Sequence, residues 1–68
     1  MRFFIMDHSG HTELELTDKI DAMDKFMELV KEGKTAATRK KGSTDYNVIR
    51  DPNKIEDETL FVPGMQGG

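Results

Sequence analysis

Polar and apolar residues alternate with different periods along the chain, and the first period predicts a β-hairpin. Residues 3–6 form a short apolar run. Residues 12–17, beyond a turn-forming Ser-Gly pair, alternate polar and apolar side chains. A period of two is what a half-buried strand requires. Leu14 and Leu16 are therefore expected on one face of the hairpin and the neighbouring glutamates on the other.

After Thr17 the period lengthens to three and four residues, which predicts an amphipathic helix. Thr17 or Asp18 can cap its N-terminus with a side-chain oxygen, and Gly33 can supply the left-handed residue after the last turn. These limits predict a helix of about fifteen residues, roughly 22 Å long. The apolar stripe of this helix consists of Ile20, Met23, Phe26, Met27 and Val30.

Three further segments have the composition of strands. Residues 35–40 are a weak strand candidate because they include two alanines, whereas residues 45–50 contain the β-branched and aromatic side chains that favour strands. Residues 51–53 have turn chemistry. Residues 59–62 form a last apolar strand, which ends at Pro63 because proline has no amide hydrogen to continue a ladder.

The element order β-β-α-β-β-β predicts an α+β domain over residues 1–63, followed by a flexible tail over residues 64–68. One mixed sheet of four to five strands is expected, with the helix packed across one face. A right-handed crossover favours the first and last strands lying side by side in the middle of the sheet. The predicted core consists of Phe3, Ile5, Leu14, Leu16, Met23, Phe26, Met27, Val30, Val48, Leu60 and Val62.

Composition excludes several classes of function. The 68 residues suffice for one small domain, and the lack of cysteine excludes disulfides, thiolate metal sites and a cysteine nucleophile. The formal net charge of -3, with both signs interspersed, favours neither nucleic acid nor an anionic membrane as a partner, and the basic residues 39–41 are interpreted as a solvated turn. The apolar N-terminal run is too short for a signal sequence or a membrane span. A soluble, cytoplasmic protein, monomeric on its own, is expected.

Polar clusters suggest no catalytic centre. His8 and His11 flank a turn, with Asp7 and Glu13 nearby, but their spacing does not suit a helical metal pair, and no metal site is predicted. The carboxylates of residues 56–58 would point to opposite sides of an extended segment. With no nucleophile and no glycine-rich phosphate loop, we expect neither enzyme activity nor a bound cofactor.

The C-terminus is the most distinctive part of the sequence. A strand and a proline precede an uncharged tail that ends on Gly67 and Gly68, which have no Cβ. Five residues beyond Pro63 reach at most about 17 Å. Such a tail can enter a narrow channel and present its terminal carboxylate, which is ionised at physiological pH, to the active site of another protein.

With this ending, the whole chain resembles the ubiquitin-like β-grasp superfamily. It is most similar to the bacterial sulfur-carrier branch typified by the small subunit of molybdopterin synthase and the thiazole-synthesis sulfur carrier. These carriers finish with an acidic pair, a hydrophobic strand, one or two prolines and Gly-Gly. The matching residues here are Asp57, Glu58, Leu60, Phe61, Val62, Pro63, Gly67 and Gly68. Two departures are Gly64, where carriers often have a second proline, and the polar region 42–53.

The resemblance implies that Gly68 carries the carboxylate that is activated and that Gly67 is the slim neighbour a channel requires. An E1-like adenylating enzyme would use ATP to activate Gly68, and the acceptor would be a sulfur-accepting synthase or a protein that becomes tagged. Phe61, Pro63 and Met65 would belong to the surface that docks on the partner. The alternative for Phe61 is that its ring packs inside the sheet.

A second hypothesis remains open at this point. The protein would then be a non-covalent β-grasp interaction module or accessory subunit, in which the Gly-Gly ending is incidental. The choice between sulfur transfer and protein tagging, the partner and the docking face of the sheet are also left open by the sequence.

Overall fold

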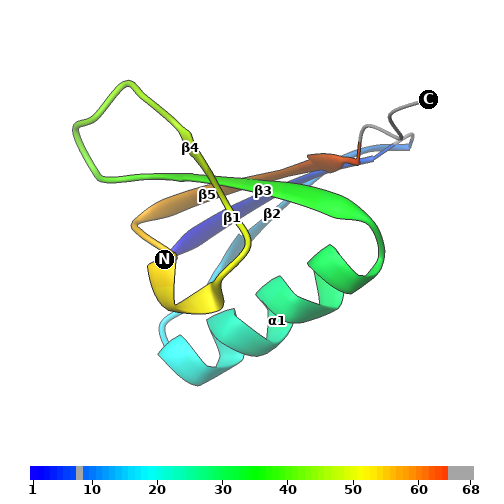
Figure 1. Ribbon diagram of the computed structural model, residues 1–68, viewed down its shortest axis with the longest axis horizontal. Helices are drawn as coiled ribbons and strands as arrows, with labels where there is room; N and C mark the ends of the chain where they lie inside the picture. The colour runs from blue at the N-terminus through cyan, green and yellow to red at the C-terminus, as the bar shows by residue number, and fades with distance from the viewer. Residues whose placement is uncertain (8, 65–68) are drawn as a thin grey trace.

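The computed structural model of the protein describes residues 1–7 and 9–64. The predictions for His8, Met65, Gly67 and Gly68 lie outside the described residues. The described chain is an α+β fold with one α-helix and a five-stranded mixed sheet (Figure 1). Its elements are β1 (Arg2–Asp7), β2 (Gly10–Glu15), α1 (Lys19–Lys31), β3 (Lys34–Arg39), β4 (Asn47–Ile49), the short 3₁₀ helix η1 (Pro52–Lys54) and β5 (Glu58–Pro63).

The strand order across the sheet is β2-β1-β5-β3-β4. β1 and β5 pair in parallel, and the other neighbouring strands are antiparallel. The predicted central pairing of the first and last strands is confirmed. α1 and η1 lie on the same side of the sheet (Figure 1).

α1 begins and ends where local chemistry predicts. The Asp18 side chain accepts a hydrogen bond from the Ile20 amide at 2.9 Å, which caps the N-terminus. Gly33, just beyond the helix, has a φ of 100°, a conformation that favours glycine. The helix has 13 residues, close to the predicted length. None of the helical segments in the described part of the chain has the length and hydrophobicity needed to cross a membrane.

Three phenylalanine rings form the centre of the core. Phe61 lies 4.9 Å from Phe3 and 5.7 Å from Phe26, measured between ring centroids, and all three side chains are fully buried. Tilted and edge-on arrangements of this kind are favourable for aromatic pairs. The core residues are Phe3, Ile5, Ala22, Phe26, Leu29, Ala36 and Phe61, with Leu14, Leu16, Val30, Ile49 and Ile55 packed against them.

The predicted core is wrong at five positions. Met23 is only half-buried and is not among the residues packed against the core. Met27 is 58% exposed, because the buried stripe of α1 runs through Ala22, Phe26 and Leu29 and places Met27 beside it. Val48 is 67% exposed on the edge strand β4. Leu60 and Val62 are only half-buried and lie on the opposite face of the sheet, because Phe61 turns inward and side chains alternate along a strand.

Strand boundaries differ most at β4. Only Asn47–Ile49 form the ladder, instead of residues 45–50. Before the strand, the Asp45 amide bonds to the Ser43 hydroxyl at 3.2 Å and not to β3. Residues 52–54, predicted as part of a turn, form η1. The weak strand candidate at residues 35–40 is confirmed as β3, which pairs with β5 and β4.

Candidate functional site

The C-terminal tail leaves from the end of a strand that is held on both sides. β5 pairs with β1 on one side and with β3 on the other. The ladder with β3 continues to the last residue of the strand, where Pro63 lies opposite Lys34. The point from which the tail departs is therefore determined by the centre of the sheet.

Gly64, the first residue after β5, touches the loop that follows α1. A Cβ at Gly64 would collide with the Gly33 carbonyl oxygen and would lie 3.2 Å from the carbonyl carbon. Both colliding atoms are backbone, so they cannot move aside as a side chain can. A second proline, which the sulfur carriers often have at this place, would not fit here. The glycine at position 64, where the sulfur carriers often have proline, thus has a steric reason in this fold.

The residues predicted for docking fall in different environments. Phe61 is fully buried against Phe3 and Phe26, so packing inside the sheet is the correct alternative and its ring is not available to a partner. Pro63 is exposed at the end of β5. Met65 lies outside the described residues, as do Gly67 and Gly68.

The open face of the sheet, opposite α1, presents an apolar row that the sequence interpretation missed. Direct register partners connect four strands, because Val48 lies opposite Ala37, Ala37 opposite Leu60, and Leu60 opposite Phe4. Ala37, Leu60 and Phe4 are half-buried and Val48 is exposed. The sequence does contain a sign of this face: residues 60–62 are continuously apolar, as in a strand with apolar contacts on both sides.

A charged row runs beside the apolar row on the same face. The register places Arg39 opposite Glu58, Glu58 opposite Arg2, and Arg2 opposite Glu15, so the signs alternate across four strands. Arg39 forms an ion pair with Glu58, and the Arg2 Nε lies 3.3 Å from the Glu13 Oε1. The Arg2–Glu13 pair is exposed and adds little stability, whereas Arg39 and Glu58 are half-buried. Both pairs limit which partners can approach, because a mismatched charge would be costly.

Arg39 also fixes the loop that precedes β4. One guanidinium nitrogen donates to the Ser43 carbonyl at 2.7 Å, and the group lies 5.3 Å from the centre of the Tyr46 ring. The Glu58 carboxylate, the loop carbonyl and the aromatic ring thus surround one side chain. The interpretation of residues 39–41 as a solvated turn is therefore wrong for Arg39, which ends β3 and is half-buried, whereas Lys40 and Lys41 are exposed beyond the strand.

The turn between β1 and β2 is organised by hydrogen bonds. Asp7 accepts from the Ser9 amide at 2.9 Å and from the Ser9 hydroxyl at 2.8 Å. His11 is exposed on β2, and His8 lies outside the described residues. Within residues 1–7 and 9–64, no three histidine, aspartate or glutamate side chains gather in a way that could hold a metal ion.

Comparison of the chain with models of known protein families, with curated proteins and with solved structures finds no match. The functional inference therefore rests on three structural features. These are the central position of β5, the close contact at Gly64 and the paired rows on the open face.

Proposed function

We propose that the protein is a small ubiquitin-like β-grasp carrier or modifier whose C-terminal glycine carboxylate is activated by an E1-like adenylating enzyme. The observation that carries the proposal is the position of β5. The last strand is central and paired on both sides, so it holds the start of a Gly-Gly tail at a defined point of the molecule.

The chain would contribute a carboxylate and the partner would contribute the catalysis. The Gly68 carboxylate would attack the α-phosphate of ATP in the enzyme and displace pyrophosphate. A sulfur nucleophile would then attack the acyl carbon, and AMP would leave. The product would be a thiocarboxylate for sulfur transfer or, through an acyl intermediate, an isopeptide bond to a lysine of an acceptor protein.

The open face suits the docking that such a reaction requires. Leu60 and Val62 point to this face from the strand that leads into the tail. Gly68 is six positions beyond Val62, a span of at most about 20 Å. A partner bound on the apolar row would therefore hold its active site within reach of the carboxylate.

The second candidate function is a non-covalent interaction module or accessory subunit. It is favoured by the open face itself, since the apolar and charged rows lie wholly within the described residues and do not depend on the tail. The two candidates differ in what removal of Gly67 and Gly68 does. A carrier loses all activity without them, and a module keeps its partner.

The test is intact mass spectrometry of the full chain after incubation with ATP, a sulfur source and an E1-like enzyme from the same genome. A thiocarboxylate adds about 16 Da, because oxygen is replaced by sulfur, and a modifier forms a lysine isopeptide instead. A chain truncated after Gln66 is the matched control and should remain unchanged. An unmodified terminus with every such enzyme, together with a truncated chain that retains its cellular role, would favour the module.

A further inference from the structure

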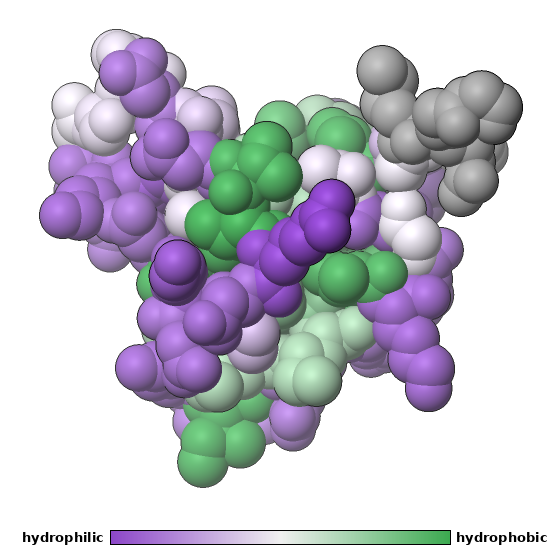
Figure 2. All heavy atoms as spheres, in the orientation of Figure 1, coloured by the Kyte–Doolittle hydropathy of each residue, from purple (hydrophilic) through white to green (hydrophobic). Residues whose placement is uncertain are grey.

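A second surface lies between α1 and β4 and borders the open face at Val48. Two adjoining hollows share Val30 and Arg50 and together form what we call the α1–β4 groove. One hollow, of about 310 Å³, lies between the end of α1, the start of β3 and β4. The other, of about 630 Å³, lies between the side of α1 and the 50–52 connection. Apolar residues are exposed in the middle of this side of the molecule, with hydrophilic residues around them (Figure 2).

The groove has apolar walls. Val30, Ala36 and Ile49 line the first hollow, and Met27 and the edge of Phe26 line the second. The exposure of Met27 is therefore part of a continuous surface and not an isolated side chain. Such a surface, rimmed by polar groups, is typical of an interaction site.

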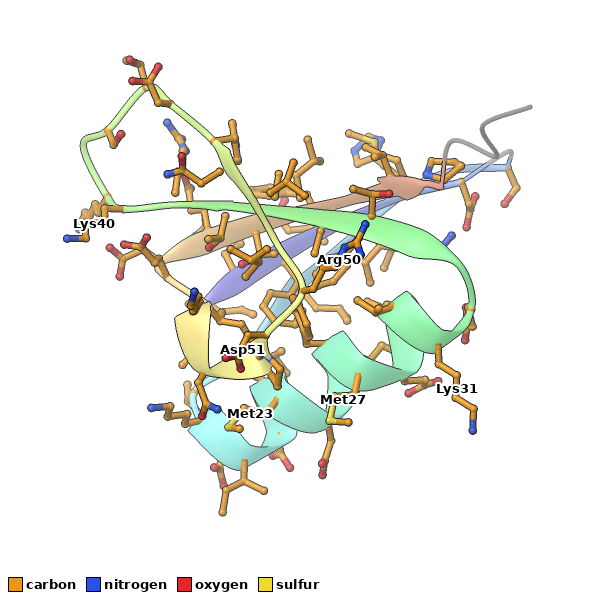
Figure 3. All side chains as sticks on the ribbon, in the orientation of Figure 1. Met23, Met27, Lys31, Lys40, Arg50 and Asp51 are labelled. Atoms are coloured by element: carbon orange, nitrogen blue, oxygen red, sulfur yellow. The ribbon has the colours of Figure 1, made fainter. Side chains whose placement is uncertain are left out.

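Three cations that form no ion pair with a described residue line the groove. Figure 3 shows Arg50 extending from the chain that follows β4, and Lys31 at the end of α1. Lys34 and Arg50 line the first hollow, which no described carboxylate lines. Lys31, Lys34 and Arg50 form no ion pair with any described residue. Because the whole chain has a net charge of -3, the first hollow is locally opposite in sign to the protein.

The second hollow carries charges of both signs, because Lys31 and Arg50 line it together with two carboxylates. Asp24 and Glu28 line the second hollow, and Glu28 is paired with Lys25 at 3.7 Å. Only the first hollow combines apolar walls with cations and no described carboxylate. A ligand that complements it is thus apolar along Val30 and Ile49 and acidic next to Lys34 and Arg50.

The free edge of β4 adds main-chain recognition. β4 is the outermost strand and pairs only with β3 in the described chain. An edge strand presents unpaired amide and carbonyl groups, which a further strand can bind. Alternate side chains of an added strand would then enter the groove beside Ile49.

We propose that the α1–β4 groove binds an extended segment of a partner protein, in which apolar residues are followed by acidic residues, and that this segment adds to the free edge of β4. The apolar side chains pack on Val30 and Ile49, and the acidic side chains pair with Arg50 and Lys34. Six residues of an added strand span about 20 Å. The proposal does not depend on activation of the C-terminus.

Selection from a display library of random peptides about twelve residues long tests the proposal, with the immobilised full chain as the target. Selected peptides should contain an apolar run joined to acidic residues. They should bind at least tenfold more weakly to the Lys34→Glu/Arg50→Glu variant, a loss of about 1.4 kcal/mol. The Lys19→Glu/Lys41→Glu variant has the same net charge, is altered outside the groove and should bind like the wild type.

Two further measurements locate the bound peptide. Backbone amide shifts should change in β4, at the start of β3 and around Val30, and circular dichroism should show that both double variants remain folded. N-methylation of alternate peptide amides should weaken binding at least tenfold in one register and little in the other, because only one set of amides faces β4.

Several results would overturn the proposal. The first is a selection that enriches no sequences with both acidic and apolar residues. The second is binding that survives Lys34→Glu/Arg50→Glu. The third is a set of amide shifts confined to the apolar row of Phe4 and Leu60. The fourth is binding that appears only after residues 65–68 are removed, because Gly33 lines the groove next to Gly64 and the tail would then be its occupant. A dimer that the same double variant abolishes would identify a second copy as the occupant.

Discussion

At the scale of single residues, two small groups control how the last strand is held. Gly64 leaves no space between the tail and the Gly33 carbonyl. Thr38, fully buried in β3, accepts from the Glu56 amide at 2.9 Å, donates to the Glu58 carbonyl at 3.1 Å and lies 3.0 Å from the Thr59 hydroxyl. The first contact joins the residue after β5 to the loop before β3, and the second joins the start of β5 to β3.

Gly64→Ala should displace the tail, because the new Cβ collides with backbone atoms. We expect a loss of about 1–3 kcal/mol in the free energy of unfolding, the usual cost of overpacking, and slower activation of the C-terminus. Urea unfolding and the rate of adenylate formation measure the two effects. Gly42→Ala is the control, since Gly42 has a φ of 89° and no neighbour within 4 Å. Gly42→Ala should lose about 1 kcal/mol in the free energy of unfolding but keep the wild-type rate of adenylate formation. Equal rates for both variants would contradict the positioning role of Gly64.

Thr38→Val should destabilise the fold, because valine has nearly the same shape as threonine but lacks the buried hydroxyl. The Glu56 amide, the Glu58 carbonyl and the Thr59 hydroxyl lose their partner, at a cost of about 1–3 kcal/mol. Urea unfolding measures this loss in the free energy of unfolding, and the m-value should stay unchanged. Thr35→Val, at a half-buried position on the open face, should change stability by no more than about 0.5 kcal/mol. A similar loss in both variants would show that the hydroxyl network contributes nothing specific.

At the scale of elements, the rotation of α1 and the register of β5 decide which side chains are buried. α1 directs Ala22, Phe26 and Leu29 at the sheet, and β5 directs Thr59 and Phe61 at the helix. The remaining apolar residues of both elements reach the surface. They supply the groove on one side and the apolar row on the other.

The rotation of α1 can be tested with two apolar truncations on the same helix. Leu29→Ala should cost about 2–5 kcal/mol, because the side chain is buried and leaves a cavity. Met27→Ala should cost less than about 1 kcal/mol, since the Met27 side chain is mostly exposed. Chemical denaturation of the two variants gives the comparison. Equal losses would mean that Met27 belongs to the core after all.

At the scale of the whole molecule, the sheet separates two surfaces. The open face carries the apolar and charged rows on the side of β5 that leads to the tail, and the α1–β4 groove lies on the helix side. An activating enzyme and an extended peptide would thus contact opposite sides of the sheet, which adjoin at Val48. Neither would require a change of fold.

Leu60→Glu tests the open face as the docking site of the activating enzyme. The side chain is half-buried on the face opposite α1, so the variant should fold, with a loss of about 1–2 kcal/mol. Activation should fall at least tenfold, because a charge would be buried in the interface. Intact mass spectrometry over time gives the rate, and Thr35→Glu on the same face, outside the apolar row, is the control. Unchanged activation of Leu60→Glu would mean that the enzyme docks elsewhere.

Most of the element order follows from local signals. The hairpin, the helix and the central pairing of the first and last strands were all predictable, because periodicity and crossover handedness decide them. The start of β4 was not predictable, since the hydrogen bond between Asp45 and Ser43 competes with the ladder there. The docking role expected for Phe61 could not be decided from sequence, because residues 60–62 are apolar on both faces.

The sequence by itself determined where α1 starts and stops, because Asp18 and Gly33 act on their immediate neighbours. It also determined that a glycine tail follows a final strand. Only the tertiary structure decided that Phe61 is buried between Phe3 and Phe26, which turns Leu60 and Val62 outward. Only the tertiary structure brings Gly64 against Gly33 and Arg50 beside Val30, because these contacts join residues that are distant in sequence and depend on how the whole sheet packs.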